Sequence, residues 1–393
     1  MKYDFDKVIN REKTNSIKWE RIFIENRFGY NDLLPMWIAD MDFKCPQPVV
    51  DALIKRVEHG IYGYSQVDDE YYQAVVNWNR KRHGLEINKD WIVFVPGVVP
   101  ALNYLIKTFC LPGDKVIIQN PVYYPFSNAV LNNGCQPGYN ALKCKNGRYT
   151  MDFDDLEEKA KDPRVKLMIL CNPHNPVGRV WKKEELEKMG EICIRNNVII
   201  IADEIHSDLI LKGYKHTPLM SISEKFAQSS IICTAPSKTF NLAGMQTANI
   251  IIKNENMRAC FYKTLESNSV GWTNPFGIVA LIAAYNDGEE WLDQVLKYLE
   301  NNVDFMETFI QQKIPEVKFV RPEGTYLSWL DFRTVTKDEK KLEVIMREKA
   351  KVALDEGHIF GEGGEGFARL NFACPRSVLE ESLHRIEKAI HSL

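Results

Sequence analysis

The middle of the chain alternates apolar runs with stretches of helical periodicity. Residues 165–172 (VKLMILCN), 198–203 (VIIIAD) and 230–236 (SIICTAP) are almost continuously apolar, as expected for strands covered on both faces of a sheet. Between the first two runs, residues 182–197 repeat their apolar positions with the period of a helix. Strands that alternate with helices predict an α/β fold with a mostly parallel sheet.

Shorter apolar runs extend the predicted sheet. We expect further strands at residues 91–95, 116–119 and 248–253, and a helix from Pro100 onward. No internal repeat and no low-complexity segment interrupts this order. The central part of the chain therefore forms one large, helix-covered sheet domain.

The pattern changes after Asn274. A long helical region, broken near residues 286–290 (NDGEE), precedes two short strand-like runs and a closing helix. This order is typical of a smaller α+β domain. We therefore predict a large domain of residues 50–285 and a small domain built from residues 1–49 and 286–393.

Composition and charge exclude several classes of protein. The chain has 393 residues, of which 45% are hydrophobic and 26% charged, as in a folded globular protein. Its net charge of −3 argues against nucleic acid as the main partner. No stretch approaches the roughly 18–20 apolar residues that span a bilayer, and the charged N-terminus lacks the apolar core of a secretory signal. The scattered cysteines have no C-x-x-C spacing, which predicts free thiols in a reducing cytoplasm and no metal site.

Polar residues of an unusual kind stand where three of the predicted strands end. Asn172 closes the first strand, Asp203 closes the second, and Lys238 follows the third. Each interval between them is roughly 30 residues, the length of one strand–helix–strand crossover. Because ligands bind outside the carboxyl ends of the strands in open α/β sheets, we expect the three side chains to converge on one crevice.

An amide, a buried carboxylate and a lysine together describe a pyridoxal phosphate site. Lys238 would form a Schiff base with the cofactor aldehyde. Asp203 would pair with the pyridine nitrogen and keep it protonated, so that the ring accepts electrons from the substrate. Asn172 would donate to the phenolic oxygen of the ring. His206, three residues after the aspartate, is a candidate contact of the same ring.

The cofactor phosphate also needs hydrogen-bond donors. Gly97 lies between a predicted strand and a predicted helix, where a glycine permits close approach of the backbone and the helix N-terminus offers free N–H groups. Tyr123, in the segment NPVYYPF after the next strand, is placed to stack on the pyridine face.

Each of these residues also has an ordinary structural interpretation. Lys238 alone suits a snorkelling surface lysine, and Asp203 alone suits a strand-end cap. Asn172 stands in an Asn-Pro pair that favours turns, and Gly97 suits a plain strand–helix turn. Taken singly, four further residues are ordinary core, structural or surface residues: Tyr123, His174, His206 and Arg369. Their joint order at the strand ends favours the cofactor site.

Residues 361–366 (GEGGEG) fit the glycine pattern of a dinucleotide-binding turn. Such a turn must follow a strand and open a helix inside a strand–helix–strand unit. The residues that follow here, FARLNFA, have the pattern of a strand instead. We therefore expect a loop beside the pocket and no nicotinamide site.

A family resemblance is carried by stretches between residues 34 and 376: LPMWIADMDF, GIYGYS, PGVVPAL, NPVYYPF, LCNPHNPVGRVW, ADEIHSDL, APSKTFNLAGMQ and RLNFACPR. They resemble the fold-type I pyridoxal phosphate enzymes of the aminotransferase-like branch. Within that branch the chain is similar to the PatB/MalY-type cystathionine β-lyases. The combination of NPHNPVGR with APSKTFNLAG is specific, and the likeness covers nearly the whole chain.

The resemblance implies the same roles for Lys238, Asp203, Asn172 and Tyr123 as the residues themselves suggest. It adds backbone donors to the phosphate at Gly97 and Val98, with Ser237 as a further donor. Substrate contacts are expected from three residues: Arg369, which would clamp the α-carboxylate, and Ala39 and Asp40 in the segment 36–43. Tyr64 would reach the phosphate of a partner subunit, because enzymes of this kind are homodimers with shared sites.

Two positions depart from the common aminotransferase pattern. Three residues after the aspartate, aminotransferases usually have a tyrosine, whereas this chain has His206. Eight residues after the lysine they usually have a phosphate-binding arginine, whereas this chain has Gln246. Both changes resemble the β-lyase subgroup.

We therefore predict a cytoplasmic carbon–sulfur β-lyase that acts on L-cystathionine or a related cysteine S-conjugate and releases a thiol, pyruvate and ammonia. An aminotransferase on the same scaffold is the main alternative, because it would use the same residues. A non-catalytic regulatory or binding protein is a further alternative. Methionine biosynthesis is one physiological role that this activity would serve, beside sulfur scavenging and detoxification.

Overall fold

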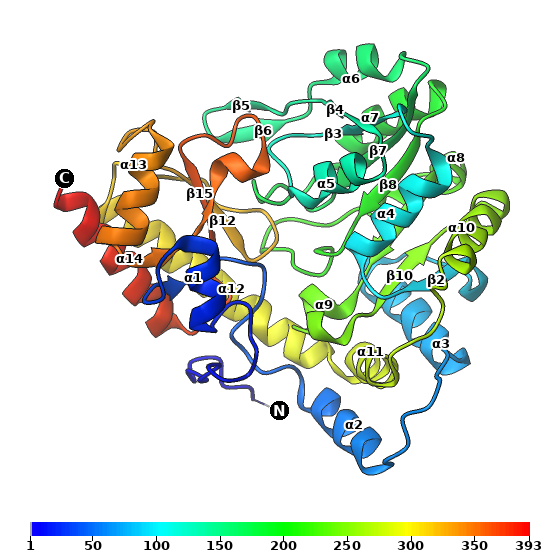
Figure 1. The fold of residues 1–393 in the computed structure, drawn as a ribbon, viewed down its shortest axis with the longest axis horizontal. Coiled ribbons are helices and arrows are strands. Elements are labelled where there is room, and N and C mark those ends of the chain that lie inside the picture. The colour runs from blue at the N-terminus through cyan, green and yellow to red at the C-terminus, as the bar shows by residue number, and fades with distance from the viewer. Residues whose placement is uncertain (1) are drawn as a thin grey trace.

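A mixed sheet of seven strands forms the core of the larger lobe in the computed structural model, which describes residues 2–393 (Figure 1). Across the sheet the strands are β2 (Ile92–Val95), β10 (Ala248–Ile251), β9 (Ser230–Thr234), β8 (Ile199–Asp203), β7 (Val165–Cys171), β3 (Lys115–Ile118) and β4 (Gln136–Tyr139). Only β10 runs antiparallel to its neighbours, and the other pairings from β9 to β4 are parallel.

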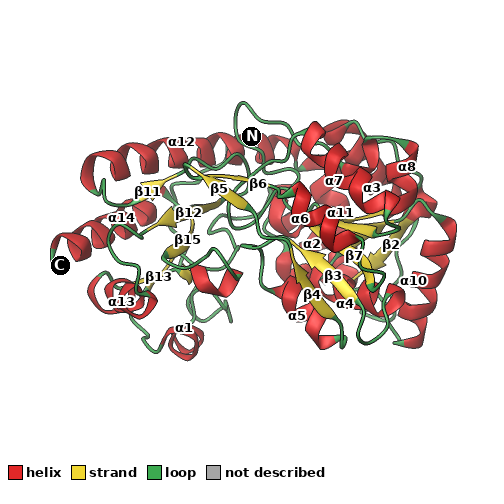
Figure 2. Cartoon of the chain, turned by 90° about the horizontal axis from the view of Figure 1, so that it is seen from above, coloured by secondary structure: helices red, strands yellow, loops and turns green. Residues whose placement is uncertain are grey.

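Helices cover both faces of this sheet (Figure 2), so its strands other than the edge strand β4 are mostly apolar on both sides. The first face packs against α4 (Val98–Phe109), α5 (Pro125–Asn132) and α10 (Glu255–Ser267). The second face packs against α3 (Asp69–Trp78), α7 (Lys183–Arg195), α8 (Glu224–Ser229) and α11 (Pro275–Asp287), with α6 (Phe153–Ala160) beside α7. Within β7, Leu167 and Ile169 belong to the first core and Met168 and Leu170 to the second, as the alternation of strand side chains requires.

The smaller lobe is built around a four-stranded antiparallel sheet, and the two lobes lie side by side in Figure 2. In spatial order the strands are β11 (Lys318–Phe319), β12 (Leu327–Asp331), β15 (Phe367–Asn371) and β14 (Asp355–Glu356). Three helices belong to the same stretch of chain: α12 (Glu289–Lys313), α13 (Glu339–Val344) and α14 (Arg376–His391).

The N-terminal segment packs with the C-terminal part of the chain. Strand β1 (Leu34–Pro35) pairs in parallel with β13 (Val352–Ala353), and α1 (Arg21–Phe28) precedes it. The next helix, α2 (Gln47–Glu58), returns to the larger lobe and contacts α11. Two further short elements are the hairpin of β5 (Lys143–Lys145) with β6 (Arg148–Thr150) and the helix α9 (Pro236–Thr239).

The predicted α/β architecture with a smaller α+β part is confirmed. The helix expected from Pro100 begins two residues earlier, at Val98. Residues 361–366 form a loop that leads directly into β15, so they do not open a helix. No helix among residues 2–393 is long and apolar enough to cross a membrane. The boundaries of the two domains stay predictions.

Candidate active site

A cavity of about 290 Å³ opens where the central strands of the large sheet end. Strand β7 contributes Cys171, β8 contributes Asp203, and Ala235 follows β9. In the sheet register Asp203 lies directly between Cys171 and Cys233, so the three strands reach the cavity side by side. The strand ends therefore converge as the spacing of the polar residues predicts.

Asp203 is a buried carboxylate without a cationic partner. One oxygen accepts a hydrogen bond from the N–H of Ile205 at 3.1 Å, and none of the ion pairs within residues 2–393 includes this side chain. Burial raises the pKa of Asp203 to about 7, although the Ile205 N–H and the charge of Lys238 oppose the shift. A buried carboxylate of this kind is stable when a cation meets it in the cavity.

Lys238 reaches the same cavity from the short helix α9, four residues after the end of β9. Its amine donates a hydrogen bond to the backbone carbonyl of Ala39, 2.7 Å away. Burial lowers the pKa of Lys238 to about 8, because the charged amine loses its hydration. About half of the amine is then neutral at about pH 8, and a nucleophile or a base requires this neutral form.

The N-terminus of α4 forms another wall of the cavity. Gly97 is the N-cap residue, and both Gly97 and Val98 line the cavity, as does Ser237. The free backbone N–H groups and the positive end of the helix dipole make this wall a suitable place for a phosphate. Gln246 lines the cavity as well and brings no charge to it.

Arg369 is held from several sides. Its guanidinium forms an ion pair with Asp355 and donates a hydrogen bond from Nη1 to Oδ1 of Asn175 at 2.9 Å. The guanidinium carbon lies 4.9 Å from the ring centre of Phe360. Arg369, Asp355 and Asn175 are buried and all line the cavity. Sequence reasoning found Arg369 but missed both of its polar partners.

Asn172 does not line the cavity, contrary to the convergence expected for it. Its side chain is fully buried, and Nδ2 donates to the backbone carbonyl of Thr217 at 3.2 Å. Cys171 faces the cavity, and because side chains alternate along a strand, the next residue points to the other face. The amide that lines the cavity is Asn175, in the same NPHNP segment.

The segment 36–43 provides a wall next to Lys238. Trp37, Ile38 and Ala39 line the cavity, whereas Asp40 does not. The side chain of Asp40 instead forms an ion pair with Arg11 at 2.8 Å. The ion pair with Arg11 therefore holds Asp40 outside the cavity lining, although its negative charge still raises the pKa of Lys238 against the effect of burial.

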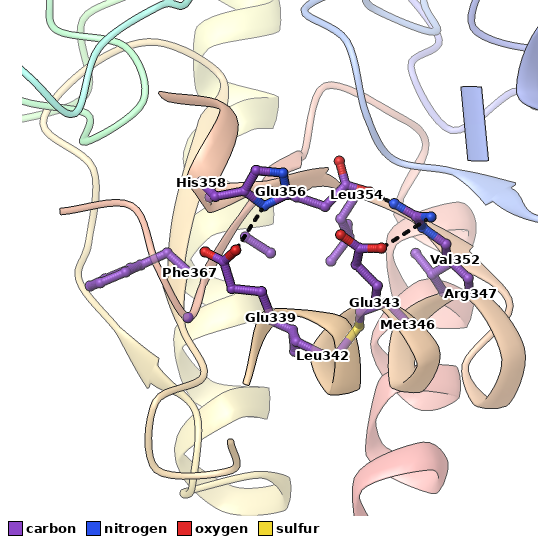
Figure 3. A pocket seen from close by; sticks show the side chains of 13 residues that line it. Glu339, Leu342, Glu343, Met346, Arg347, Val352, Leu354, Glu356, His358 and Phe367 are labelled. Carbon is purple, nitrogen blue, oxygen red and sulfur yellow. Dashed lines mark hydrogen bonds and ion pairs between the residues drawn. The ribbon is translucent and has the colours of Figure 1, made fainter. Parts of the chain in front are cut away.

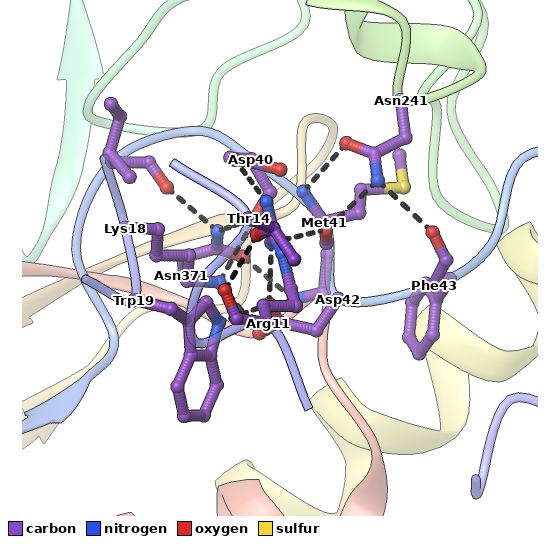
Figure 4. A network of polar contacts seen from close by, with 12 residues as sticks. Arg11, Thr14, Lys18, Trp19, Asp40, Met41, Asp42, Phe43, Asn241 and Asn371 are labelled. Atoms are coloured by element: carbon purple, nitrogen blue, oxygen red, sulfur yellow. Dashed lines mark hydrogen bonds and ion pairs between the residues drawn. The ribbon is translucent and has the colours of Figure 1, made fainter. Parts of the chain in front are cut away.

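A buried polar network holds the segment 36–43 in place (Figure 4). The amine of Lys18, which is fully buried, lies 2.7 Å from Oδ2 of Asp42 and 2.9 Å from the backbone carbonyl of Asp40. Arg11 and Trp19 donate to the other oxygen of the Asp42 carboxylate at 2.8 and 2.7 Å. The side-chain amide of Asn371 donates to two backbone carbonyls of the segment, each at 2.8 Å. We call Arg11, Lys18, Trp19 and Asp42 the N-terminal clamp.

Tyr123 and His206 both line the cavity. The imidazole of His206 is buried, burial lowers its pKa to about 3, and Nδ1 has no hydrogen-bond partner in the described part of the chain. His206 is therefore neutral at any ordinary pH. His174 is a structural histidine, since it is buried outside the cavity lining with a ring nitrogen 2.9 Å from the carbonyl of Pro121.

Tyr64 lies outside the cavity of its own chain. Its side chain is 90% exposed, and the ring stacks at a tilt on Trp272 with 4.9 Å between ring centres. Trp272 is 67% exposed itself. Two large exposed aromatic rings in contact are unusual on a free surface. Tyrosine and tryptophan are enriched in protein interfaces.

The described residues fit pyridoxal phosphate as a cofactor. Asp203 is buried and lacks the cation that a protonated pyridine nitrogen would supply. Lys238 has a lowered pKa and only a backbone carbonyl as its hydrogen-bond partner. The N-terminus of α4 offers backbone donors for a phosphate at a third position of the same cavity. A mostly parallel sheet with these groups at the carboxyl ends of its central strands is typical of a pyridoxal phosphate-dependent enzyme of fold type I.

The chain belongs to the aminotransferase class I and II family, whose model matches residues 32–386. It is 46% identical over 387 residues to cystathionine beta-lyase PatB of Bacillus subtilis (strain 168), which covers 98% of this chain and 100% of the relative. Two solved structures are similar over almost the whole length. Cystalysin of Treponema denticola, which contains pyridoxal 5′-phosphate, has a TM-score of 0.96 at 42% identity and covers 100% of both chains. A C-S lyase of Staphylococcus hominis with bound pyridoxal 5′-phosphate has a TM-score of 0.91 at 35% identity and covers 99% of this chain and 98% of that one.

These comparisons confirm the family resemblance, the fold type, the pyridoxal phosphate cofactor and the carbon–sulfur lyase class that the sequence predicts. The individual roles of the site residues are not tested by them. Those roles are therefore proposals that rest on the geometry described above.

Proposed function

We propose that this enzyme cleaves the carbon–sulfur bond of L-cystathionine or a related cysteine S-conjugate. The substrate and one water yield a thiol, pyruvate and ammonia: the bond between the β-carbon and sulfur breaks, the sulfur leaves with the electron pair, and water replaces the amino group. The observation that carries the proposal is the convergence of Lys238, Asp203 and Arg369 on one cavity of a chain with lyase relatives.

Lys238 would bind the cofactor aldehyde, and Asp203 would hold the pyridine nitrogen. When bound, pyridoxal phosphate supplies an electron-poor ring that accepts the charge left on the substrate α-carbon. Asn175 replaces Asn172 as the amide for the phenolic oxygen, since only Asn175 lines the cavity. Tyr123 and neutral His206 complete the ring contacts, and Gly97, Val98 and Ser237 offer donors to the phosphate.

Substrate orientation is assigned to Arg369. The guanidinium accommodates a carboxylate through two parallel, charge-assisted hydrogen bonds. Asn175 and Phe360 hold it in place, so little side-chain freedom is lost when the substrate binds. Ala39 lies at the wall next to Lys238, and we retain it as a substrate contact through its backbone.

Proton transfer is assigned to Lys238. Its lowered pKa of about 8 favours the neutral amine that removes the α-proton. The carbonyl of Ala39, 2.7 Å from Nζ, stabilises the charged amine after the transfer. A thiol with a pKa of roughly 8.5 leaves from the β-carbon with little acid assistance.

We further propose a cytoplasmic homodimer in which Tyr64 reaches the phosphate of the partner's site. The exposure of Tyr64 and Trp272 supports an interface at this surface. All nine cysteines of the chain are free, which supports a reducing compartment. Methionine biosynthesis stays a hypothesis about the pathway.

One assay separates the lyase from the aminotransferase alternative. The purified protein, supplied with pyridoxal phosphate and L-cystathionine but no keto acid, should form pyruvate and a free thiol in equal amounts. Lys238→Ala serves as the inactive control. No pyruvate in this assay, together with amino-group transfer once a keto acid is added, would contradict the lyase assignment.

A further inference from the structure

The ion pair of Arg369 with Asp355 places a negative charge inside the substrate cavity. The two residues are direct neighbours in the pairing of β14 with β15, and both side chains are at most 5% exposed. Because their backbones are paired in the sheet, the carboxylate cannot move far from the guanidinium. Asp355 is therefore a permanent feature of the site that is assigned to the substrate α-carboxylate.

The ion pair of Arg369 with Asp355 favours the orientation of the guanidinium but lowers its affinity for a substrate carboxylate. A guanidinium has more N–H donors than Asp355 and Asn175 use, so a substrate carboxylate still finds free donors on Arg369. The arriving carboxylate, however, shares the guanidinium with a second carboxylate of the same charge. Like charges a few ångström apart in a buried site repel strongly.

We propose that Asp355 is a built-in counter-ion that orients Arg369 and, by repulsion, weakens the binding of the α-carboxylate. The proposal rests on the assignment of Arg369 to substrate binding. In the free enzyme Asp355 prevents the high free energy of an unpaired buried arginine. In the complex it limits the affinity for amino acids, which favours release of the carboxylate product.

The next residue of the same strand provides a matched control. Glu356 points to the opposite face of β14, where it forms an ion pair with Arg347 (Figure 3) and another with Arg27. That face borders a cavity of only about 20 Å³, which is separate from the lining of the active-site cavity. Glu356→Gln therefore removes two ion pairs of the same strand without changing the charge beside Arg369.

The test measures binding of L-alanine, which has no leaving group on its β-carbon, to the enzyme loaded with pyridoxal phosphate. Binding is followed by the change in the visible absorption of the bound cofactor. In Asp355→Asn the dissociation constant should fall by at least about tenfold, because repulsion is removed while hydrogen-bond geometry is kept. Glu356→Gln should match the wild type. L-Alaninamide, which lacks the carboxylate, should bind Asp355→Asn no more tightly than the wild type.

A stability measurement provides a second, independent readout. Without ligand, Asp355→Asn should melt below the wild type, and L-alanine should raise its melting temperature by more than it raises that of the wild type. Asp355→Ser, which is also neutral, gives the same test if the asparagine variant does not fold. An unchanged or higher dissociation constant for L-alanine in these variants would overturn the inference while the lyase assignment stands. A wild type that bound neither the cofactor nor L-alanine would contradict both.

Discussion

The amine of Lys238 and the backbone carbonyl of Ala39 lie 2.7 Å apart, although 199 residues separate them in the chain. This hydrogen bond connects Lys238 in the larger lobe to the chain that follows β1, a strand that pairs with β13 of the smaller lobe. The position of the Ala39 carbonyl in turn depends on the N-terminal clamp. The first residues of the chain thereby take part in shaping the active site.

Lys18→Met tests this dependence. The substitution removes the ammonium group 2.7 Å from Asp42, whose carboxylate keeps Arg11 as an ion-pair partner, so the free energy of unfolding should fall by about 1–3 kcal/mol. The turnover number should fall as well, because the wall beside Lys238 loses its support. Urea unfolding and steady-state kinetics measure the two effects. Lys44→Met, which changes an exposed lysine next to the same segment, should differ from the wild type by less than about 0.5 kcal/mol.

The burial of Asp203 gives the cofactor-free protein a characteristic pH dependence. Its pKa in the folded state is about 7, above the ordinary value of 3.8, so folding favours the protonated carboxyl. Its contribution to stability is fully present below pH 4 and is lost as the pH rises to about 7. Relative to Asp203→Asn, the wild type without cofactor should therefore lose roughly 3–4 kcal/mol over this range.

Denaturant unfolding of both proteins, each stripped of cofactor, measures this difference at several pH values. The variant should become relatively more stable as the pH rises. A difference between the two proteins that does not change with pH would show that Asp203 is not buried as described. Because the cofactor supplies a cation, it should stabilise the wild type more than the variant at neutral pH.

The two asparagines of the NPHNP segment should respond differently to substitution. Asn175→Ala removes the hydrogen bond that orients Arg369, so KM for the amino-acid substrate should rise about tenfold or more. Asn172→Ala removes a buried contact with Thr217 and should lower the melting temperature without a comparable change in KM. Steady-state kinetics on both variants decide the assignment, and the reverse pattern would restore Asn172 to the site.

Sequence patterns locate the carboxylate and the lysine of this site because both groups lie at or just beyond the ends of apolar strands. Asp203 and Lys238 follow runs whose continuous apolar character already indicates a covered parallel sheet. The position of Asn172 outside the cavity lining has a signal in the sequence, since alternation beyond the end of β7 at Cys171 points the next side chain to the opposite face. Asn175 lies in the loop beyond β7, where no periodicity indicates the direction of its side chain.

Other features depend on contacts between distant parts of the chain. Asp355 stands in a strand of only two residues, and its importance comes from pairing with Arg369 across the sheet. The clamp joins residues 11–19 to residues 40–42 through buried charges, which the sequence alone presents as an ordinary polar N-terminus. Hydrophobic periodicity reports which face of an element is buried, but it does not report which polar groups meet there.

Shared active sites in a dimer can be tested by complementation. Tyr64→Ala should weaken cofactor binding, and Lys238→Ala should abolish activity. When the two variants are unfolded together and refolded as a mixture, hybrid dimers should regain activity, because one of their two sites then has both an intact lysine and an intact tyrosine. If the refolded mixture is no more active than the two variants refolded separately, the assignment of Tyr64 to the partner's site is contradicted.

The covalent attachment of the cofactor tests the central claim most directly. The protein loaded with pyridoxal phosphate is reduced with borohydride, which fixes the carbon–nitrogen bond between cofactor and lysine, and is then digested and analysed by mass spectrometry. The account predicts that the peptide containing Lys238 carries the cofactor mass, and that Asp203→Asn retains this label while losing catalytic activity. Label on another lysine, or no label on a protein that binds the cofactor, would contradict it.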